Sequence, residues 1–242
     1  MNYIVLSDIH LEFGYYKVPE FPPETIVILA GDIHVGMRAE EFIVDLCKRF
    51  AHVIYVPGNH EFYRHTLEEV NAFWKDVEIT NFHYLYNDKI LLDGTVILGT
   101  TLWTDVGDMD WFTVRNLKQN MTDFRVIKEF GIEGWKREHD IAKKFLEDNI
   151  EDGCMVVTHF MPHERCITER FRGDRLNPGF VTTDLDHLFD GRVRAWIYGH
   201  THEYNNFNIR GTELICNPRG YCGYEPTRDY IPFEFKTDRT WW

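Results

Sequence analysis

The chain has 242 residues, of which 44% are hydrophobic, so it is long and apolar enough to form one domain over residues 1–242 with a substantial core. Its formal net charge is -13. This charge argues against non-specific nucleic-acid binding, because broad contact with the phosphate backbone requires clustered Lys and Arg side chains. No apolar run approaches the roughly 20 residues that cross a bilayer, so we expect no membrane partner.

The cysteines indicate a reducing compartment. They are odd in number, scattered, and never spaced as Cys-x-x-Cys. This pattern predicts neither a disulfide framework nor a thiolate zinc site, and we expect a cytoplasmic protein. The five positions are Cys47, Cys154, Cys166, Cys216 and Cys222.

Short apolar runs rich in β-branched residues recur along the chain and are typical of strands, several of them buried on both faces. They cover residues 3–6, 26–30, 53–56, 90–92, 96–98, 155–157, 195–198 and 214–216. Apolar stripes with helical spacing lie between them, at residues 42–50, 67–77 and 141–150. Thr66 and Glu69 have the spacing of a capping box at the start of the second stripe. The alternation predicts an α/β fold.

Two irregular stretches interrupt this pattern. Residues 103–131 combine a polar segment with an ambiguous helix, and residues 165–184 are rich in charge, Gly and Pro. Long irregular stretches inside compact domains are usually functional or mobile. We therefore expect residues 103–131 to form an insertion that covers the functional site, and residues 165–184 to form the opposite wall.

Five short motifs follow apolar runs and carry side chains that bind metals. They are Asp8 with His10, Gly31 with Asp32, the sequence Gly58-Asn59-His60-Glu61, Thr158 with His159, and the sequence Gly199-His200-Thr201-His202. In open α/β sheets, functional groups lie at the carboxyl ends of the strands, so residues that are distant in the chain can converge there. The order of the motifs, from residue 8 to residue 202, resembles the calcineurin-like metallophosphoesterase family.

The resemblance implies both a fold and a reaction. The fold is an α/β sandwich of two packed mixed β-sheets flanked by helices. The reaction is metal-dependent hydrolysis of a phosphomonoester or phosphodiester, by attack of a metal-bridging hydroxide. By the same resemblance, Asp32 bridges two metals and His60 is not a ligand but donates a proton during catalysis. The remaining ligands are Asp8, His10 and His202 for one metal and Asn59, His159 and His200 for the other.

The ligand types also bear on the cofactors and the partner. Imidazole, carboxylate and amide groups without sulfur suit two divalent ions, with manganese preferred and iron or zinc as alternatives. A carboxylate that bridges two such ions holds them roughly 3.5 to 4 Å apart. The two ions carry more positive charge than Asp8, Asp32 and one hydroxide return. The pocket therefore suits a small phosphorylated substrate despite the acidic surface.

Four further residues have both a functional and a structural interpretation. Glu61 is expected to orient His10 or a neighbouring ligand, or else to make a buried structural hydrogen bond. Arg219 either contacts the phosphate or satisfies carbonyl groups of its own turn. His163 is a candidate for the substrate-binding rim, unless it is an ordinary surface or core histidine. Trp103 is a candidate for stacking on a nucleobase, unless it packs in the core.

Several substrate classes remain open at this stage. An aromatic content of 15% favours a small nucleotide or cyclic nucleotide over a phosphoprotein, because bases stack on aromatic rings. A protein phosphatase or a nuclease of the same family is the alternative. A non-catalytic scaffold on this fold is the alternative from another class, but such a scaffold typically loses ligands that are intact here.

Overall fold

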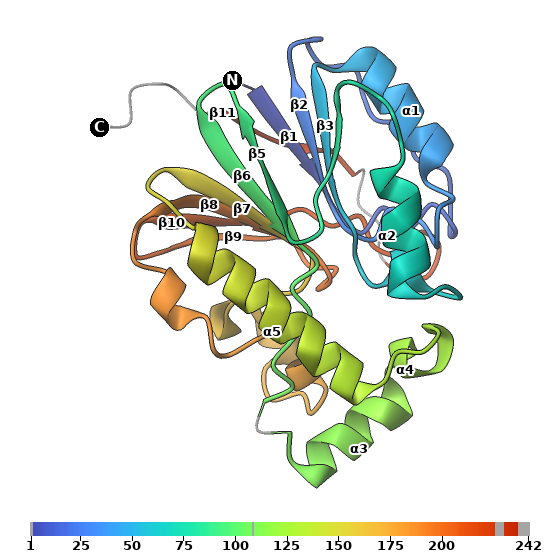
Figure 1. Cartoon of the computed structure of the whole chain (residues 1–242), viewed down its shortest axis with the longest axis vertical. Helices are drawn as coiled ribbons and strands as arrows, with labels where there is room; N and C mark the ends of the chain where they lie inside the picture. Colours follow the sequence, from blue (N-terminus) through green and yellow to red (C-terminus); the bar gives the residue numbers. More distant parts are fainter. Residues whose placement is uncertain (1, 108, 226–229, 237–242) are drawn as a thin grey trace.

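The computed structural model describes residues 2–107, 109–225 and 230–236. Two mixed β-sheets pack face to face, and helices cover their outer faces (Figure 1). This arrangement confirms the predicted α/β sandwich. Within the described part of the chain, no helix combines the length and the apolar character needed to span a membrane.

The first sheet has the strand order β11-β1-β2-β3-β4. Its strands are β1 (Asn2–Leu6), β2 (Ile26–Ala30), β3 (His52–Val56), β4 (Phe82–Tyr84) and β11 (Phe233–Lys236). Strands β1 to β4 are parallel, and β11 pairs with β1 in the antiparallel direction at the edge. Helices α1 (Glu40–Arg49) and α2 (Leu67–Lys75) lie on the outer face of this sheet (Figure 1).

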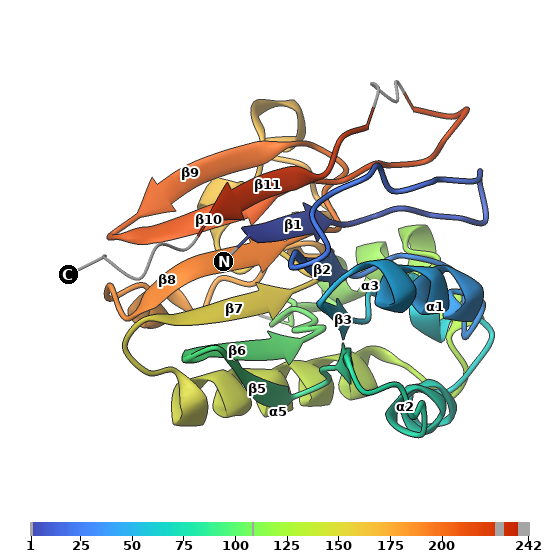
Figure 2. The same cartoon turned by 90° about the horizontal axis from the view of Figure 1, so that it is seen from above.

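The second sheet has the order β5-β6-β7-β8-β10-β9. Its strands are β5 (Asp88–Leu92), β6 (Thr95–Thr100), β7 (Cys154–Thr158), β8 (Val193–Tyr198), β9 (Asn205–Ile209) and β10 (Thr212–Cys216). The four central strands are parallel, whereas β5 and β9 are antiparallel edges. Helix α5 (Ile132–Asn149) runs along the outer face (Figure 2).

The core follows from the alternation of side chains along buried strands. In β1, Val5 joins a cluster between the two sheets, while Leu6 joins the cluster beneath the helices. In β2, Ile28 and Leu29 divide in the same way. Each central strand therefore buries both of its faces, which explains why the sequence reads as continuous apolar runs.

Every strand and helical stripe predicted from the sequence is present, with changed boundaries. Helix α5 is longer than predicted, because its buried residues begin at Ile132 and continue at helical spacing through Trp135 to Leu146. The sequence analysis missed β4, β9 and β11. Strand β4 has only three residues. Strand β9 is rich in Asn, which rarely favours strands, and pairing with β10 holds it in place.

Side-chain caps mark the start of helix α2 and of a helix in the first irregular stretch. Thr66 and Glu69 form the predicted capping box of α2 through reciprocal hydrogen bonds. In the irregular stretch, the Asp110 side chain accepts hydrogen bonds from two backbone amides at the start of α3 (Trp111–Asn120). Helix α4 (Asp123–Val126) follows directly. Short 3-10 helices occupy Glu164–Cys166, Glu169–Phe171 and Asn177–Gly179 in the second irregular stretch, with others at His60–Phe62 and Asp186–Leu188.

The packing between the sheets predicts a clear difference between two substitutions. Ile28→Ala should lower the free energy of unfolding by about 2–5 kcal/mol, because Ile28 is fully buried between the sheets and its loss leaves a cavity. Leu91→Ala on β5 is the control, because Leu91 is 66% exposed and should cost less than about 1 kcal/mol. Urea unfolding of both variants measures the difference, and equal losses would contradict the described core.

Candidate metal centre

The parallel strands of both sheets end at the same edge of the sandwich. The side chains that could bind metals lie in the loops that follow these strands. In the first sheet these are Asp8 after β1, Asp32 after β2 and Asn59 after β3. In the second sheet they are His159 after β7, and His200 and His202 after β8. Backbone hydrogen bonds connect the loops, from Asp8 N to Gly31 O (3.0 Å) and from Gly199 N to His159 O (2.9 Å).

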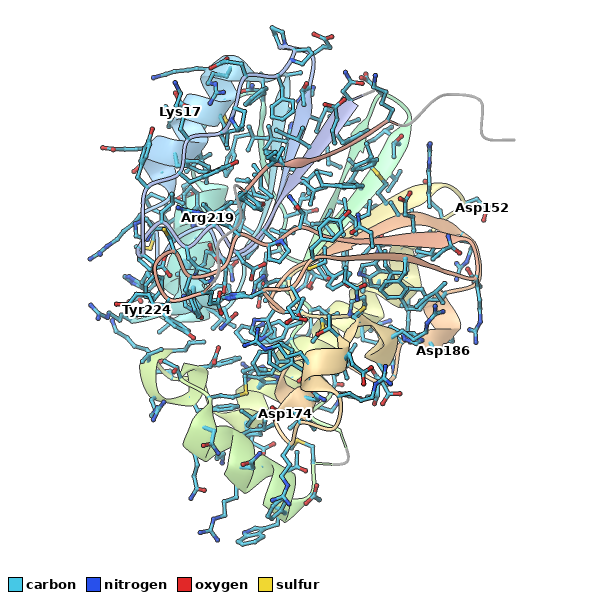
Figure 3. All side chains as sticks on the ribbon, turned by 180° about the vertical axis from the view of Figure 1, so that it is seen from behind. Lys17, Asp152, Asp174, Asp186, Arg219 and Tyr224 are labelled. Carbon is cyan, nitrogen blue, oxygen red and sulfur yellow. The ribbon has the colours of Figure 1, made fainter. Side chains whose placement is uncertain are left out.

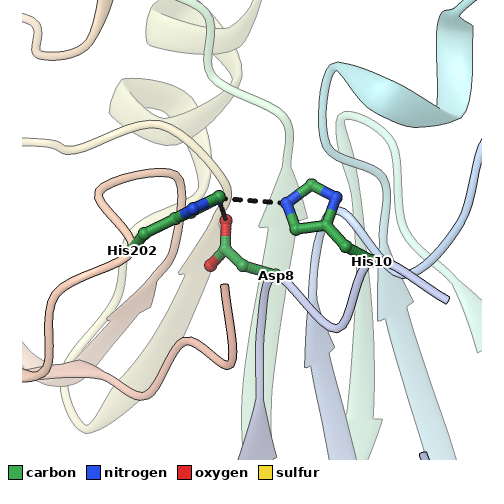
Figure 4. A group of neighbouring side chains, drawn as sticks. All are labelled: Asp8, His10 and His202. Carbon is green, nitrogen blue, oxygen red and sulfur yellow. Dashed lines mark hydrogen bonds and ion pairs between the residues drawn. The ribbon is translucent and has the colours of Figure 1, made fainter. Parts of the chain in front are cut away.

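The first cluster contains Asp8 and His10 from the loop after β1 and His202 from the loop after β8, and the three side chains point toward one another (Figure 4). The Nε2 atoms of His10 and His202 are 3.0 Å apart, and His202 Nε2 is 3.5 Å from Asp8 Oδ1. His10 Nδ1 donates to Glu12 Oε1 (3.0 Å), and His202 Nδ1 donates to Glu225 Oε2 (2.8 Å). In the neutral rings both Nε2 atoms therefore carry lone pairs that face each other. Only a cation, either a proton or a metal ion, relieves this repulsion.

The second cluster contains Asp32, His159 and His200, with Asn59 beside them. His159 Nδ1 donates to the carbonyl oxygen of Ala30 (3.0 Å). Its Nε2 lies 3.0 Å from Asn59 Oδ1 and 3.4 Å from Asp32 Oδ1. Burial disfavours the charged ring, but Asp32 raises the pKa of His159 to about 9. The negative field that attracts this proton equally suits a metal ion.

Asp32 lies between the two clusters. Its Oδ2 is 3.7 Å from His10 Nε2, and its Oδ1 is 3.4 Å from His159 Nε2. The carboxylate is almost fully buried, which would raise its pKa, but His159 and His60 hold that pKa well below the usual value. Asp32 is therefore an anion whose two oxygens face different sets of nitrogen atoms.

Two buried atoms of the clusters support the same interpretation. Asp8 Oδ2 and His200 Nε2 have no hydrogen-bond partner among residues 2–107, 109–225 and 230–236. A buried polar atom without a partner costs free energy, so native proteins rarely leave one unsatisfied. Both atoms belong to groups whose nitrogen and oxygen ligands lie within 4.8 Å of one another. The donor set and the unsatisfied atoms fit divalent cations.

Comparison with known proteins identifies the family. The profile of the calcineurin-like phosphoesterases matches residues 1–204. The chain belongs to the calcineurin-like phosphoesterase family. Because this family uses divalent metal ions, the chain is a metal-dependent phosphoesterase. The match confirms the resemblance found in the motifs.

Two relatives cover almost the whole chain. An uncharacterised protein of Acanthamoeba polyphaga mimivirus is 24% identical over 255 residues, which span 89% of this chain and 90% of that protein. The crystal structure of phosphopantetheinyl hydrolase from Mycobacterium tuberculosis has a TM-score of 0.73 at 18% identity. It covers 91% of this chain and 89% of that chain. At this identity, the structural likeness concerns the fold.

The backbone of this calcineurin-like centre adopts an unusual conformation at five residues. They are Asp8, His10, Asp32, His200 and His202, with φ angles between 47° and 69°. Non-glycine residues rarely occupy this left-handed region, and each such residue costs of the order of 1–3 kcal/mol. The surrounding loops therefore hold these side chains in positions that the local backbone alone would not favour.

Asn59 is oriented by an aspartate that the sequence analysis missed. Asn59 Nδ2 donates to Asp123 Oδ1 (2.7 Å) and to the Tyr63 hydroxyl (3.2 Å), so Asn59 Oδ1 faces His159. Asp123 is the first residue of α4 and is only 3% exposed. Burial raises its pKa. No sequence signal distinguishes Asp123, because a short polar helix gives no periodicity that would predict burial.

His60 occupies the edge of the centre. Its Nδ1 donates to Glu12 Oε1 (2.9 Å), and its Nε2 is 3.8 Å from Asp32 Oδ2 and 3.4 Å from the Tyr221 hydroxyl. Burial lowers the pKa of His60, but Asp32 and Glu12 together raise it to about 9. A protonated imidazole that borders the cavity can donate a proton. Glu12 and Tyr221 were both missed, although Glu12 stands only two positions after His10.

Glu61 supports Asp32 rather than His10. Its carboxylate accepts hydrogen bonds from the backbone amides of Gly58 (2.6 Å), Ile33 (2.7 Å) and Asp32 (3.2 Å). The partner of His10 Nδ1 is Glu12 instead. Glu61 therefore fixes the loop that carries Asp32. The sequence analysis allowed for this, because it expected Glu61 to orient either His10 or a neighbouring ligand.

The three predicted substrate contacts lie in different surroundings, and of the three Arg219 lines the cavity beside the metal centre. Trp103 is 1% exposed and packs against Phe130 and Trp135, so it is part of the core and cannot stack on a base. The Arg219 guanidinium donates to the carbonyl oxygens of residues 9, 14 and 15, which leaves it bound to the protein's own loop. His163 lies outside the lining of the cavity beside the metal centre and bonds to Asp186 (3.2 Å).

A cavity of about 870 Å³ opens beside the two clusters. Residues 120–123 form one side of it, and Arg170, Phe171, Leu176 and Phe180 form another. The first irregular stretch thus borders the site, as does the second. Figure 3 labels Arg219, which lines the cavity, and Asp174, which belongs to the second irregular stretch.

The close approach of the loops gives glycine a necessary role in the motifs. A Cβ atom at Gly58 would overlap Asp32 Oδ1, and a Cβ atom at Gly199 would lie 2.7 Å from Asp8 Oδ2. The Gly-Asn-His-Glu motif therefore begins with glycine because Asp32 fills the space that a side chain would need.

This packing predicts that Gly58→Ala displaces the Asp32 carboxylate and lowers the metal content of the purified protein. Gly131→Ala is the matched control, because a Cβ atom there meets nothing within 4 Å and the residue has an extended backbone with φ of -112°. Elemental analysis of both variants after identical metal loading measures the effect. Full metal content in Gly58→Ala would show that the loops can accommodate the extra methyl group.

Proposed function

We propose that the protein is a binuclear metal-dependent phosphoesterase. The observation that carries this proposal is the position of Asp32, because its two carboxylate oxygens face two different clusters of ligands. Asp32 would bridge the two metals. The remaining ligands are Asp8, His10 and His202 for one metal and Asn59, His159 and His200 for the other.

The ligand set favours manganese, with iron or zinc as alternatives, because it offers imidazole, carboxylate and amide groups without sulfur. Bound divalent metals supply Lewis acidity, which activates water and stabilises charge on phosphoryl oxygens. The chain itself provides an anion at Asp32 and a proton donor at His60. His60 is suited to protonate the leaving group, because it lines the cavity and its Nδ1 donates a hydrogen bond to Glu12.

The cavity supports a small phosphorylated substrate. Its volume of about 870 Å³ lies in the range of small-molecule sites, and Phe171, Phe180, Tyr204 and Tyr221 are among its lining residues. Aromatic walls suit a flat ring, so a small nucleotide or cyclic nucleotide stays slightly preferred although Trp103 is buried. A protein phosphatase or nuclease activity of the same family is the alternative, and a scaffold without activity is the alternative from another class.

We also propose a cytoplasmic location, on the ground that the cysteines are suited to a reducing compartment. All five are free thiols. Disulfides rarely form in the cytoplasm, and free buried cysteines are common there. Fractionation of the cells that make the protein would test this proposal.

A hydrolysis panel with defined metal loading tests the activity. It compares an aryl phosphomonoester, an aryl phosphodiester, cyclic nucleotides and a phosphopantetheinyl ester, the last because one structural relative is named for that group. We expect metal-dependent turnover of at least one ester, and preference for the cyclic nucleotides would support the proposed substrate. An absence of both bound metal and hydrolysis with manganese, iron and zinc would instead favour the scaffold.

Two substitutions should separate a ligand from a proton donor. Asp32→Ala should remove at least one metal ion per chain, because it deletes the carboxylate that faces both clusters. His60→Gln should keep both metals and lower kcat about 10²- to 10⁴-fold, which is the usual contribution of a general acid. Metal analysis and steady-state kinetics measure both effects. Equal metal loss in the two variants would move His60 into the ligand set.

A further inference from the structure

Glu12 is an acidic residue that contacts both His10, in the first cluster, and His60. It lies in the loop after β1, two positions beyond His10, and its side chain is 16% exposed. A single oxygen atom, Oε1, is 3.0 Å from His10 Nδ1 and 2.9 Å from His60 Nδ1. The rings of His10 and His60 stand edge to face with centroids 4.5 Å apart. One carboxylate oxygen thus serves two imidazoles from different strands.

The contacts determine which ring nitrogen carries hydrogen. Glu12 Oε1 lies within hydrogen-bond distance of both Nδ1 atoms, whereas both Nε2 atoms face other groups. An ionised carboxylate only accepts hydrogen bonds, and both Nδ1 atoms must therefore be donors. Each Nε2 atom then points to the opposite side, where His10 faces His202 and His60 faces Asp32.

We propose that Glu12 is a positioning residue that holds the His10 and His60 rings, through their Nδ1–H groups, with both Nε2 atoms directed into the reaction site. The inference rests on the proposed phosphoesterase function, because in that proposal His10 is a metal ligand and His60 is the proton donor, and Glu12 would orient both. Carboxylates that accept from ligand imidazoles fix the orientation of the ring and increase its basicity. Glu12 extends this support to a residue that is not a ligand.

A different arrangement of the same three residues must be distinguished. His10, Glu12 and His60 have ligand atoms close enough to hold a metal of their own. That ion would use the Nδ1 atoms of both rings and replace their hydrogens. The two arrangements therefore differ in the protonation of Nδ1 and in the number of metals per chain.

The first measurement reads the protonation directly and does not require activity. Nitrogen-15 NMR of the zinc-loaded protein should show protonated Nδ1 atoms in both His10 and His60. Glu12→Ala should remove the slowly exchanging Nδ1 proton of His60 without changing the number of bound metals at saturating zinc. Unprotonated Nδ1 in the native protein, or loss of a third metal in Glu12→Ala, would overturn the proposal.

The second measurement is kinetic. At saturating metal, Glu12→Ala should lower kcat about 10- to 100-fold with little change in KM, as is typical for a residue that orients a functional side chain. Glu12→Gln should be milder, because its amide oxygen can still accept both hydrogen bonds. Glu20→Gln is the control, because the Glu20 side chain is 82% exposed and lies away from the centre, against Arg49.

A double substitution shows whether Glu12 acts through His60. In the His60→Gln background, Glu12→Ala should lower kcat by less than threefold, because its main target is already gone. An undiminished effect in that background would contradict the proposal. If the native protein hydrolyses no ester at all, the proposed function fails, while the NMR experiment still decides the role of Glu12.

Discussion

The convergence of electron-rich atoms at one sheet edge is the constraint on which this structure depends. His10 Nε2 faces His202 Nε2, and His159 Nε2 faces oxygens of Asn59 and Asp32. Such contacts are unfavourable in a buried place unless positive charge lies among them. The Nδ1–H groups of these histidines cannot neutralise the repulsion, because they already donate hydrogen bonds to carboxylate and carbonyl oxygens. The arrangement of side chains at this edge of the sheets therefore favours bound cations.

The two sheets make that convergence possible. Asp8, Asp32 and Asn59 come from the first sheet, whereas His159, His200 and His202 come from the second. The apolar cluster between the sheets sets the distance between these two groups. Backbone strain at the candidate ligand residues and the close contact of Gly58 with Asp32 show how tightly the loops are packed. Core packing and site geometry are thus parts of one arrangement.

Much of this could be predicted from the sequence, for physical reasons. Strands such as β2 are buried on both faces and so appear as continuous apolar runs, and the candidate ligands follow them directly. By contrast, the edge strand β9 is rich in Asn, and the edge strand β11 has only 4 residues, too few for its alternation to stand out. Trp103 was misassigned because its position next to a site loop says nothing about its burial. Glu12, Asp123 and Glu225 were missed because a supporting carboxylate needs only spatial proximity.

The position of Asp123 has a consequence for the evolution and engineering of this protein. The α3–α4 segment borders the cavity. Replacing this segment would therefore be an obvious way to accommodate a different leaving group. Yet its Asp123 also holds the amide of Asn59. A chimera that replaced the whole α3–α4 segment would lose this hydrogen bond, and the Asn59 amide would be free to rotate. A graft that keeps an acid at this position would therefore change the wall of the cavity without releasing Asn59.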